Sequence, residues 1–335
     1  MIRTDEKQRR VEALRALARE GGAALAPMAG WTDRAFRRVC RRLGARFVVT
    51  ELLSSEGLRR GGEKTARLAR FDEDERPVGI QLFGHEPGSM ADGARLAARL
   101  APDFIDINFG CPARKVTRRG GGVACMREPA LMDEIMRAVN EAVALPVTVK
   151  IRAGWDAEHR NAPEAARLAE AAGLALVAVH GRTRRQGFTG RADPGIIRET
   201  REAVAIPVIG NGDVVDAASY RRLMDETGVA MVLVGRAATG NPWVFAEIEA
   251  ARRGEAWRPP SLAGRVELLL GNLAERIEDH GERRGVVSFR KQMGATIRGL
   301  PGAAALRREL FVLETRAAVE ATLREYVRRA GENAV

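Results

Sequence analysis

The sequence predicts an α/β protein: a (β/α)8 TIM barrel followed by a small C-terminal all-helical domain. Two observations lead to this prediction. Short apolar runs rich in β-branched residues recur along most of the chain, and each is followed by a glycine or polar turn and then a helical pattern. Near Arg258 this alternation stops, and only helical periodicity continues to the end of the chain.

Eight of these runs match the pattern of a buried strand. They centre on Leu25, Val48, Ile80, Ile105, Val149, Val177, Val208 and Val232. Because such strands are apolar on both faces and alternate with helices, they predict a closed parallel barrel rather than an open sheet. The helices are readable too, since Asp33 can cap a helix that buries Phe36 and Val39, and Pro163 can begin another.

Three segments follow from this pattern. Residues 1–20 are expected to form an N-terminal helical extension, residues 21–257 the barrel, and residues 261–335 the helical domain. Pro259 and Pro260 separate the last two segments. The helical domain has only a small excess of basic over acidic side chains, so an RNA-binding domain and a solvated helical bundle both remain open.

The composition is that of an ordinary soluble protein. Hydrophobic residues make up 45% and charged residues 30%, and no run approaches the roughly 20 apolar residues that cross a bilayer. We expect a cytoplasmic monomer with no membrane contact. The three cysteines predict neither a disulfide framework nor a metal site. The net charge of +11 suggests a polyanionic partner, although the abundance of arginine also fits a coding bias.

Polar side chains gather where the predicted strands end. In a (β/α)8 barrel these carboxyl ends carry the active site, so their residues are the candidates for function. The candidates, in chain order, are Pro27, Met28, Ala29, Gln81, Asn108, Cys111, Lys150, His180, Arg182, Asn211, Gly212, Asp213, Gly235 and Arg236.

Several of these residues suit a flavin. The glycine turns after the last two strands expose backbone N–H groups that commonly bind a phosphate, and Arg236 adds a charge, although such turns can also merely reverse the chain. No strand-linked GxGxxG motif is present, which favours FMN over NAD as the resident cofactor. Lys150, within the apolar run VTVKIR, needs an anion or strong acceptor, which a reduced flavin or a structural salt bridge would supply. Gln81 and Asn108 suit a ring edge or could satisfy backbone groups.

Cys111 begins the turn GCPARKV at the end of the fourth strand. Four cations follow it closely, namely Arg114, Lys115, Arg118 and Arg119, and we expect them to stabilise a thiolate, so that the thiol can act as an acid. An inert cysteine is the alternative. Cys125 is expected to be structural and Cys40 to lie in a helix core.

The loops after the fourth and sixth strands carry nine cations and no acid between residues 111 and 127 and between residues 181 and 191. A small neutral substrate would not require this charge, whereas an RNA backbone would. The sequence therefore predicts a phosphate track at the barrel mouth, with a solvated rim as the alternative. Its members are Arg114, Lys115, Arg118, Arg119, Arg127, Arg182, Arg184, Arg185 and Arg191.

Together these residues resemble the tRNA-dihydrouridine synthases, and within that family the bacterial B-type branch. The resemblance lies in APMAGWTDRAFR (26–37), DINFGCPARKV (106–116), VKIRAGW (149–155), VHGRTR (179–184), IGNGDV (209–214) and VGRAATGNPWVF (234–245). It covers most of the barrel, whereas the helical domain has little motif of its own. The loop RRGGGVAC departs from what we expect of the family, since three consecutive glycines predict a flexible loop.

The resemblance implies an enzyme in which NADPH reduces FMN, hydride passes to C6 of a uracil in tRNA, and Cys111 protonates C5. It implies a uridine in the D-loop as substrate and tRNA binding by residues 261–335. The implied FMN contacts are Pro27, Met28, Ala29, Gln81, Lys150, His180, Asn211, Gly212, Asp213, Gly235 and Arg236. Asn108 would orient the uracil, and Arg114, Lys115, Arg182 and Arg184 would contact the RNA.

Two other functions compete with this one. Another FMN barrel, such as a dihydroorotate or dihydropyrimidine dehydrogenase, would act on a free pyrimidine, but it would not need the cationic rim or a helical tail. An RNA-binding or regulatory protein would keep the barrel without turnover, but it would not need both Cys111 and Lys150.

Overall fold

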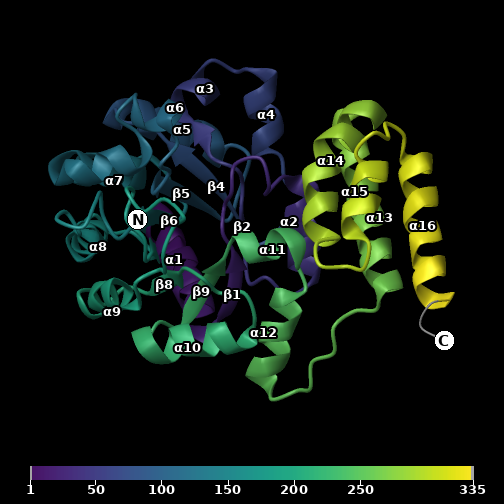
Figure 1. Cartoon of the computed structure of the whole chain (residues 1–335). Coiled ribbons are helices and arrows are strands. Elements are labelled where there is room, and N and C mark those ends of the chain that lie inside the picture. Colours follow the sequence, from purple (N-terminus) through teal and green to yellow (C-terminus); the bar gives the residue numbers. More distant parts are fainter. Residues whose placement is uncertain (1, 333–335) are drawn as a thin grey trace.

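The computed structural model describes residues 2–332, and within them nine parallel strands form one sheet that closes into a barrel (Figure 1). Around the barrel the strand order is β1-β9-β8-β7-β6-β5-β4-β2, and β3 pairs with β4. Backbone bonds from Arg46 N to Ala23 O (2.8 Å) and from Leu25 N to Phe47 O (3.2 Å) join the two ends of this order. The strands are β1 (Gly22–Leu25), β2 (Val48–Val49), β3 (Leu53–Ser54), β4 (Val78–Phe83), β5 (Phe104–Phe109), β6 (Val147–Arg152), β7 (Leu176–His180), β8 (Val208–Asn211) and β9 (Met231–Val234). The predicted (β/α)8 barrel is confirmed.

The second predicted strand is shorter than expected, because β2 ends at Val49 and a separate short strand, β3, follows beyond the predicted run. The reason lies at Thr50, between the two strands. Its N–H still donates to the Gly79 carbonyl (2.9 Å), but its hydroxyl, rather than a backbone carbonyl, accepts from the N–H of Gln81 (3.1 Å). A side chain therefore replaces one bond of the ladder, and the strand is interrupted there.

The longer helices that follow the strands cover the outside of the barrel, and shorter helical segments lie in the loops at the ends of the strands (Figure 1). Asp33 caps α2 by accepting from Phe36 N (3.0 Å), and Pro163 lies in the first turn of α8, so both predicted helix starts are confirmed. These segments are α2 (Arg34–Arg42), α3 (Ser55–Arg59), α4 (Glu63–Ala69), η1 (Glu73–Glu75), α5 (Pro87–Ala98), α6 (Arg114–Thr117), η2 (Gly122–Arg127), α7 (Pro129–Ala142), α8 (Ala162–Ala171), α9 (Pro194–Glu202), α10 (Ala217–Thr227), α11 (Arg236–Gly240) and α12 (Val244–Arg253).

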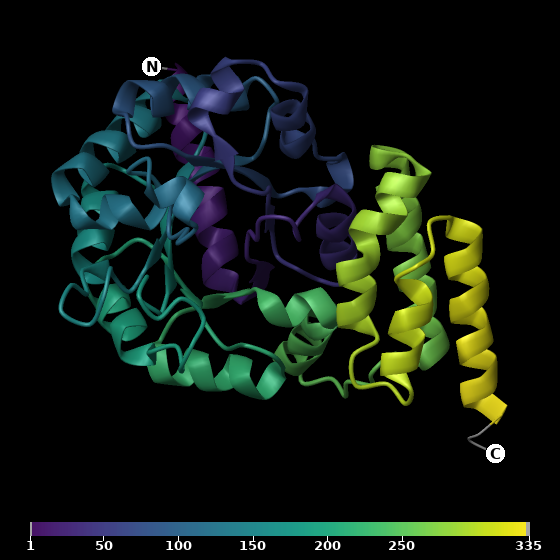
Figure 2. The ribbon, with the colours of Figure 1, turned by 45° about the horizontal axis from the view of Figure 1, so that its top comes forward.

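The N-terminal helix α1 (Ile2–Glu20) closes one end of the barrel. Its residues Val11, Leu14 and Ala18 are buried against side chains that point into the barrel, such as Phe104 and Leu176. In Figure 2 this helix lies within the ring of outer helices. Since the strand carboxyl ends form the opposite, open end, α1 provides the closed floor beneath the candidate site.

Four helices complete the chain: α13 (Leu262–His280), α14 (Glu282–Thr296), α15 (Ala303–Leu310) and α16 (Arg316–Glu332). They share an apolar core of their own, built around Leu273, Phe289 and Leu323, and stand beside the barrel (Figure 1). Ion pairs fix them to α2, including Arg34–Asp279 (2.9 Å) and Arg276–Asp33. Residue 1 and residues 333–335 of the predicted terminal segments lie outside the described residues. Among the described helices, none has the length and apolarity needed to cross a membrane.

Candidate active site

A chain of hydrogen bonds inside the barrel leads to Cys111. Asp106 is buried and accepts from the Thr148 hydroxyl (2.6 Å) and from Nε2 of Gln81 (2.7 Å). Gln81 Oε1 accepts from Asn108 Nδ2 (2.8 Å), and Asn108 Oδ1 accepts from the N–H of Cys111 (2.8 Å). Gln81 and Asn108 therefore both help to position the Cys111 turn.

Lys150 lies beside this chain, on β6. Its Nζ donates to Asn211 Oδ1 (3.1 Å), and no carboxylate lies within ion-pair distance among the described residues, so the salt bridge considered from the sequence is not formed. Burial is the main cause that lowers the pKa of Lys150, to about 8, and the charge of Arg152 lowers it further. Lys150 is partly buried and offers an ammonium with unused donors on β6.

Arg152, two residues further along β6, is buried and connects two loops. Its Nε donates to the Gly110 carbonyl (2.8 Å), and its Nη1 donates to the carbonyls of Thr183 (3.0 Å) and Gly187 (2.9 Å). Burial lowers the pKa of this guanidinium to about 10. The side chain thus joins the Cys111 loop to the loop after β7 and places a positive charge between them.

The surroundings of the Cys111 thiol favour its protonated form, which agrees with the expected acid, but the four cations expected to stabilise its thiolate are not the groups that act on it. Burial raises its pKa, and the N–H of Ala113 and the charges of Arg152 and Lys150 counteract that rise only in part. The four cations that follow Cys111 do not produce this effect, because they point to the surface. The turn therefore presents a thiol that keeps its proton, which is what an acid requires.

The three glycines after this turn are closely packed rather than open. Gly122 has φ +62°, and a Cβ there would lie 2.7 Å from the Cys111 carbonyl oxygen. Gly121 approaches the Gly84 carbonyl, and the Val123 N–H donates to the Cys111 carbonyl (3.2 Å). Cys125 is buried beside them, and burial raises the pKa of its thiol to about 12. A buried thiol that keeps its proton agrees with the structural role predicted for Cys125. The three glycines thus have close neighbours, and at Gly122 both the positive φ and the approach of the Cys111 carbonyl require glycine.

The turns after β8 and β9 lie side by side, because these two strands are paired in the barrel. Within the described residues, the backbone N–H groups of Gly212, Asp213 and Gly235 donate to no protein acceptor. A Cβ on Gly212 would lie 2.4 Å from that of Ala192, so a side chain could not occupy that position. Met28, from the loop after β1, lies near Gly235, and Pro27 faces the same small cavity as Lys150. Residues from the loop after β1 thus lie beside residues of β6 and of the turn after β9.

Arg182 was predicted to belong to the unpaired cations of the rim, and this is wrong. Its guanidinium is buried, and its Nη2 contacts the Asp213 carboxylate at 2.7 and 2.8 Å and donates to the Gly190 carbonyl (2.6 Å). It therefore holds the loop after β7 against the turn after β8. His180 is buried beside it, and burial together with the surrounding cations lowers its pKa to about 2, so the imidazole is neutral.

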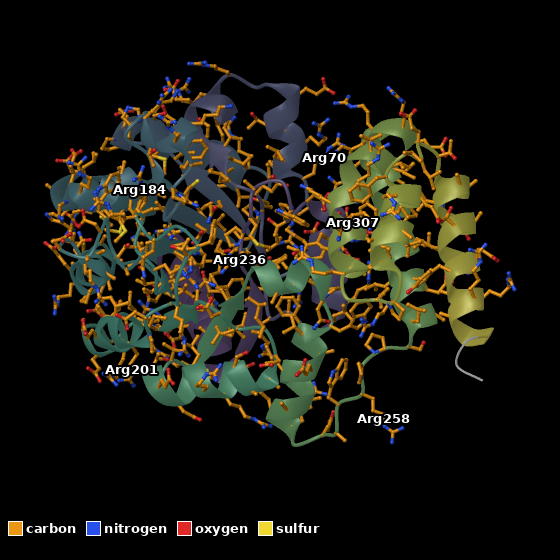
Figure 3. The ribbon with its side chains drawn as sticks, in the orientation of Figure 1. Arg70, Arg184, Arg201, Arg236, Arg258 and Arg307 are labelled. Atoms are coloured by element: carbon orange, nitrogen blue, oxygen red, sulfur yellow. The ribbon has the colours of Figure 1, made fainter. Side chains whose placement is uncertain are left out.

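The remaining rim cations lie on the surface. Arg114, Lys115, Arg118 and Arg119 are exposed and line a hollow of about 380 Å³. Arg127 and Arg184 lie over the indole ring of Trp155, with their Cζ atoms 5.0 and 4.7 Å from its centroid. Arg184 and Arg236 mark two parts of this mouth in Figure 3. The guanidinium of Arg236 lies over the ring of Phe188, which is 55% exposed.

Comparison with known proteins identifies the family to which this site belongs. A family model described as dihydrouridine synthase (Dus) matches residues 24–331. The chain is 42% identical over 304 residues to tRNA-dihydrouridine synthase B of Pseudomonas aeruginosa, covering 90% of this chain and 91% of that protein. It is 37% identical over 304 residues to a probable tRNA-dihydrouridine synthase of Rickettsia bellii, covering 90% of this chain and 93% of that protein.

The chain belongs to the dihydrouridine synthase family. A solved structure of 2-naphthoyl-CoA reductase in complex with 2-naphthoyl-CoA is also similar, with a TM-score of 0.52 and 10% identity over 70% of this chain and 50% of that one. At this low identity the likeness concerns the fold alone, and it agrees with the barrel described above.

Two features of this dihydrouridine synthase family member escaped the sequence reasoning. The sequence does contain a signal for Arg152. Side chains two residues apart on a strand share a face, so Arg152 points to the same side of β6 as the candidate Lys150. Phe188 gave no such signal, since it lies in an irregular loop. Its contacts with Arg152 and Arg236 depend on how that loop folds.

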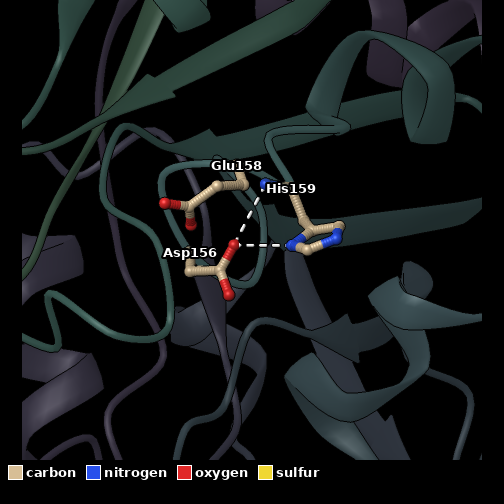
Figure 4. Close-up of side chains that lie close together, drawn as sticks. All are labelled: Asp156, Glu158 and His159. Atoms are coloured by element: carbon tan, nitrogen blue, oxygen red, sulfur yellow. Dashed lines mark hydrogen bonds and ion pairs between the residues drawn. The ribbon is translucent and has the colours of Figure 1, made fainter.

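A group of potential metal ligands lies on the loop after β6, namely Asp156, Glu158 and His159 (Figure 4). Asp156 Oδ1 interacts with both the backbone N–H of His159 (3.0 Å) and its Nδ1 (2.7 Å). Glu158 and His159 are exposed. These contacts organise a surface turn, and nothing in the arrangement requires a cation.

Proposed function

We propose that the protein reduces uridines in the D-loop of tRNA to 5,6-dihydrouridine, with FMN as its bound cofactor and NADPH as the reductant of FMN. The observation that carries the proposal is the position of Cys111 at the barrel mouth, where its N–H donates to Asn108, Lys150 and Arg152 lie beside it, and burial raises the pKa of its thiol. Membership of the dihydrouridine synthase family, and the names of its relatives, support the same reaction.

The donors at the mouth fit FMN. Lys150 makes one hydrogen bond within the described residues, so two of its three N–H groups are left for an electron-rich ring. The unpaired N–H groups of Gly212, Asp213 and Gly235, with the Arg236 guanidinium, suit a phosphate. The other proposed contacts are Pro27, Met28, Ala29, Gln81, His180 and Asn211. When bound and reduced, FMN supplies a hydride to C6 of the uracil.

Reduction of the C5–C6 double bond also requires a proton at C5, which Cys111 supplies. Burial keeps the thiol protonated before the reaction. The thiolate that remains lies in the electric field of Lys150 and Arg152, since both charges act to lower the pKa of Cys111. The same surroundings therefore retain the proton and stabilise its conjugate base, as a general acid requires.

The rim and the helical tail supply the RNA contacts in this proposal. Arg114, Lys115 and Arg184 are accessible cations around the mouth, and we assign them to tRNA phosphates. Arg182 instead acts through the loop that it holds. Helices α13–α16 bind the tRNA body, and Asn108 orients the uracil once the base has left its stack and entered the mouth.

The test is to incubate the FMN-loaded protein with NADPH and an unmodified tRNA transcript and then to measure the masses of the oligonucleotide fragments after ribonuclease digestion. The proposal predicts a gain of two hydrogens at a D-loop uridine, formed about 100-fold or more slowly by Cys111→Ala. Turnover of a free pyrimidine such as orotate, with no change in the tRNA, would instead establish the small-molecule dehydrogenase.

A further inference from the structure

Two arginines and a tryptophan form a cluster at the barrel mouth, and of these three residues the proposed function assigns a role only to Arg184. Trp155 follows β6, Arg127 ends η2 after β5, and Arg184 follows β7. Three consecutive loops of the barrel thus meet at one indole ring, with the two guanidinium carbons 5.0 and 4.7 Å from its centroid. We call these three residues the arginine–tryptophan cluster.

The geometry of the cluster is fixed by the backbone. The N–H of Arg184 donates to the Gly154 carbonyl (2.9 Å), and the N–H of Arg185 donates to the Trp155 carbonyl (3.0 Å). The N–H of Trp155 in turn donates to the His159 carbonyl (2.9 Å). Two backbone bonds therefore join the loops after β6 and β7 beside Trp155, and they set the relative positions of Trp155 and Arg184 before any ligand arrives.

The charge of the cluster is not neutralised within the described residues. Neither Arg127 nor Arg184 forms an ion pair there, although many other arginines of this chain do, such as Arg34 and Arg38. Two like charges near one ring repel each other, and the indole offsets only part of this because each cation–π contact contributes about 0.5–2 kcal/mol. An anion that accepts from both guanidinium groups would relieve the repulsion.

The cluster lies across the mouth from the helical tail. The tail contacts α2, which follows β1, and the loop of Trp155 follows β6. In the closed order of the barrel, β6 is four strands from β1 in either direction. Figure 3 shows Arg184 on the side of the barrel away from α13–α16. An RNA strand that crosses the mouth from the tail would reach this cluster.

We propose that the arginine–tryptophan cluster binds a phosphodiester group of the RNA on the side of the mouth opposite the helical tail. This inference rests on the proposed function, because the RNA is its substrate. Arg127 and Arg184 donate to the phosphate oxygens, and Trp155 keeps their guanidinium groups in place. Held by the tail on one side and by the cluster on the other, the strand is fixed on both sides of the base that enters the barrel.

The test is the salt dependence of tRNA binding. The dissociation constant of the FMN-loaded protein for a fluorescent unmodified tRNA transcript is measured at several salt concentrations, for the wild type and for R127Q/R184Q. Loss of one phosphate contact is expected to reduce the slope of log K against log salt by about 1. The charge-preserving R127K/R184K should retain most of the slope. Arg201→Gln is the matched control, because Arg201 is exposed at the end of α9, on the closed side of the barrel.

An unchanged slope in R127Q/R184Q would overturn the inference, even with a lowered Tm, because the cluster would then be structural. If the double variant does not fold, Arg127→Gln alone provides the measurement, since Arg127 is exposed and its replacement needs no repacking. A reduced slope for this single variant supports the inference, and an unchanged one overturns it. If the wild type does not bind tRNA, the proposed function is wrong as well. If the wild type reduces uridine but the salt slope of R127Q/R184Q is unchanged, only the inference that the cluster binds a phosphodiester is wrong.

Discussion

Replacing Lys150 with methionine separates the contribution of this residue to stability from its contribution to cofactor binding. Its pKa is lowered from 10.5 to about 8, chiefly by burial. At about 1.4 kcal/mol per pKa unit, keeping the charge in the folded apo-protein at pH 7 costs about 3 kcal/mol. This is an upper bound, because Lys150 is only partly buried. The unpartnered Asn211 Oδ1 left behind costs about 1–3 kcal/mol.

We therefore expect Lys150→Met to leave the apo-protein as stable as the wild type or more stable by up to about 2 kcal/mol at pH 7. The same variant should bind FMN about 10- to 100-fold more weakly, because it lacks a charge-assisted hydrogen bond. The wild-type apo-protein should also gain stability between pH 8 and 10.5, since the folded state releases the Lys150 proton there while the unfolded state still binds it. The variant should lack this gain.

Thermal unfolding of the apo-proteins by circular dichroism, at pH 7 and pH 9.5, measures the stability, and fluorescence titration measures FMN affinity. Lys115→Met is the matched control, because Lys115 is exposed on the rim, and it should change neither quantity. Destabilisation of Lys150→Met by more than about 1 kcal/mol, or unchanged FMN affinity, would refute this reasoning.

Three further predictions follow from the packing around the site. Glu75→Ala should lower the free energy of unfolding by about 3–5 kcal/mol, because Arg37 loses its buried partner at 2.6 Å, and a Tm within 1 °C of the wild type in a thermal melt would contradict this. Gly122→Ala should slow tRNA-dependent flavin reoxidation at least about 10-fold, because the added Cβ displaces the Cys111 turn. Gly61→Ala is the control and should not slow it, because Gly61 also has a positive φ (+67°) but no close neighbour. Equal rates in the two variants would show that the close packing at Gly122 does not position Cys111. Iodoacetamide should alkylate Cys111 of the apo-protein slowly at pH 8 and faster only above pH 9, as followed by mass spectrometry, and rapid alkylation at pH 7 would show that burial does not raise its pKa.

Much of the fold could be predicted because buried parallel strands have a distinctive sequence pattern. The residues placed at strand ends meet at the mouth for the same reason, since the carboxyl ends of a closed parallel barrel share one rim. The early end of the second strand could not be predicted, because it depends on a bond between the Thr50 hydroxyl and the N–H of Gln81, 31 residues away.

The errors concern side-chain direction within loops. Four cations follow Cys111 closely in the sequence, but their side chains extend to the surface. Burial therefore has the largest effect on the pKa of the Cys111 thiol. Arg182 was predicted to be unpaired because its own loop contains no acid. Its partner, Asp213, comes from the next turn of the barrel, and only the fold brings the two together.

The central claim is that Cys111 donates a proton while a tRNA uridine is reduced. It is tested most directly by following the flavin of the NADPH-reduced protein in the absence of oxygen after an unmodified tRNA transcript is added. We expect rapid reoxidation that requires the RNA and that is slower by about 100-fold or more in Cys111→Ala. Reoxidation at equal rates in the two proteins, or by a free pyrimidine but not by the tRNA, would contradict it.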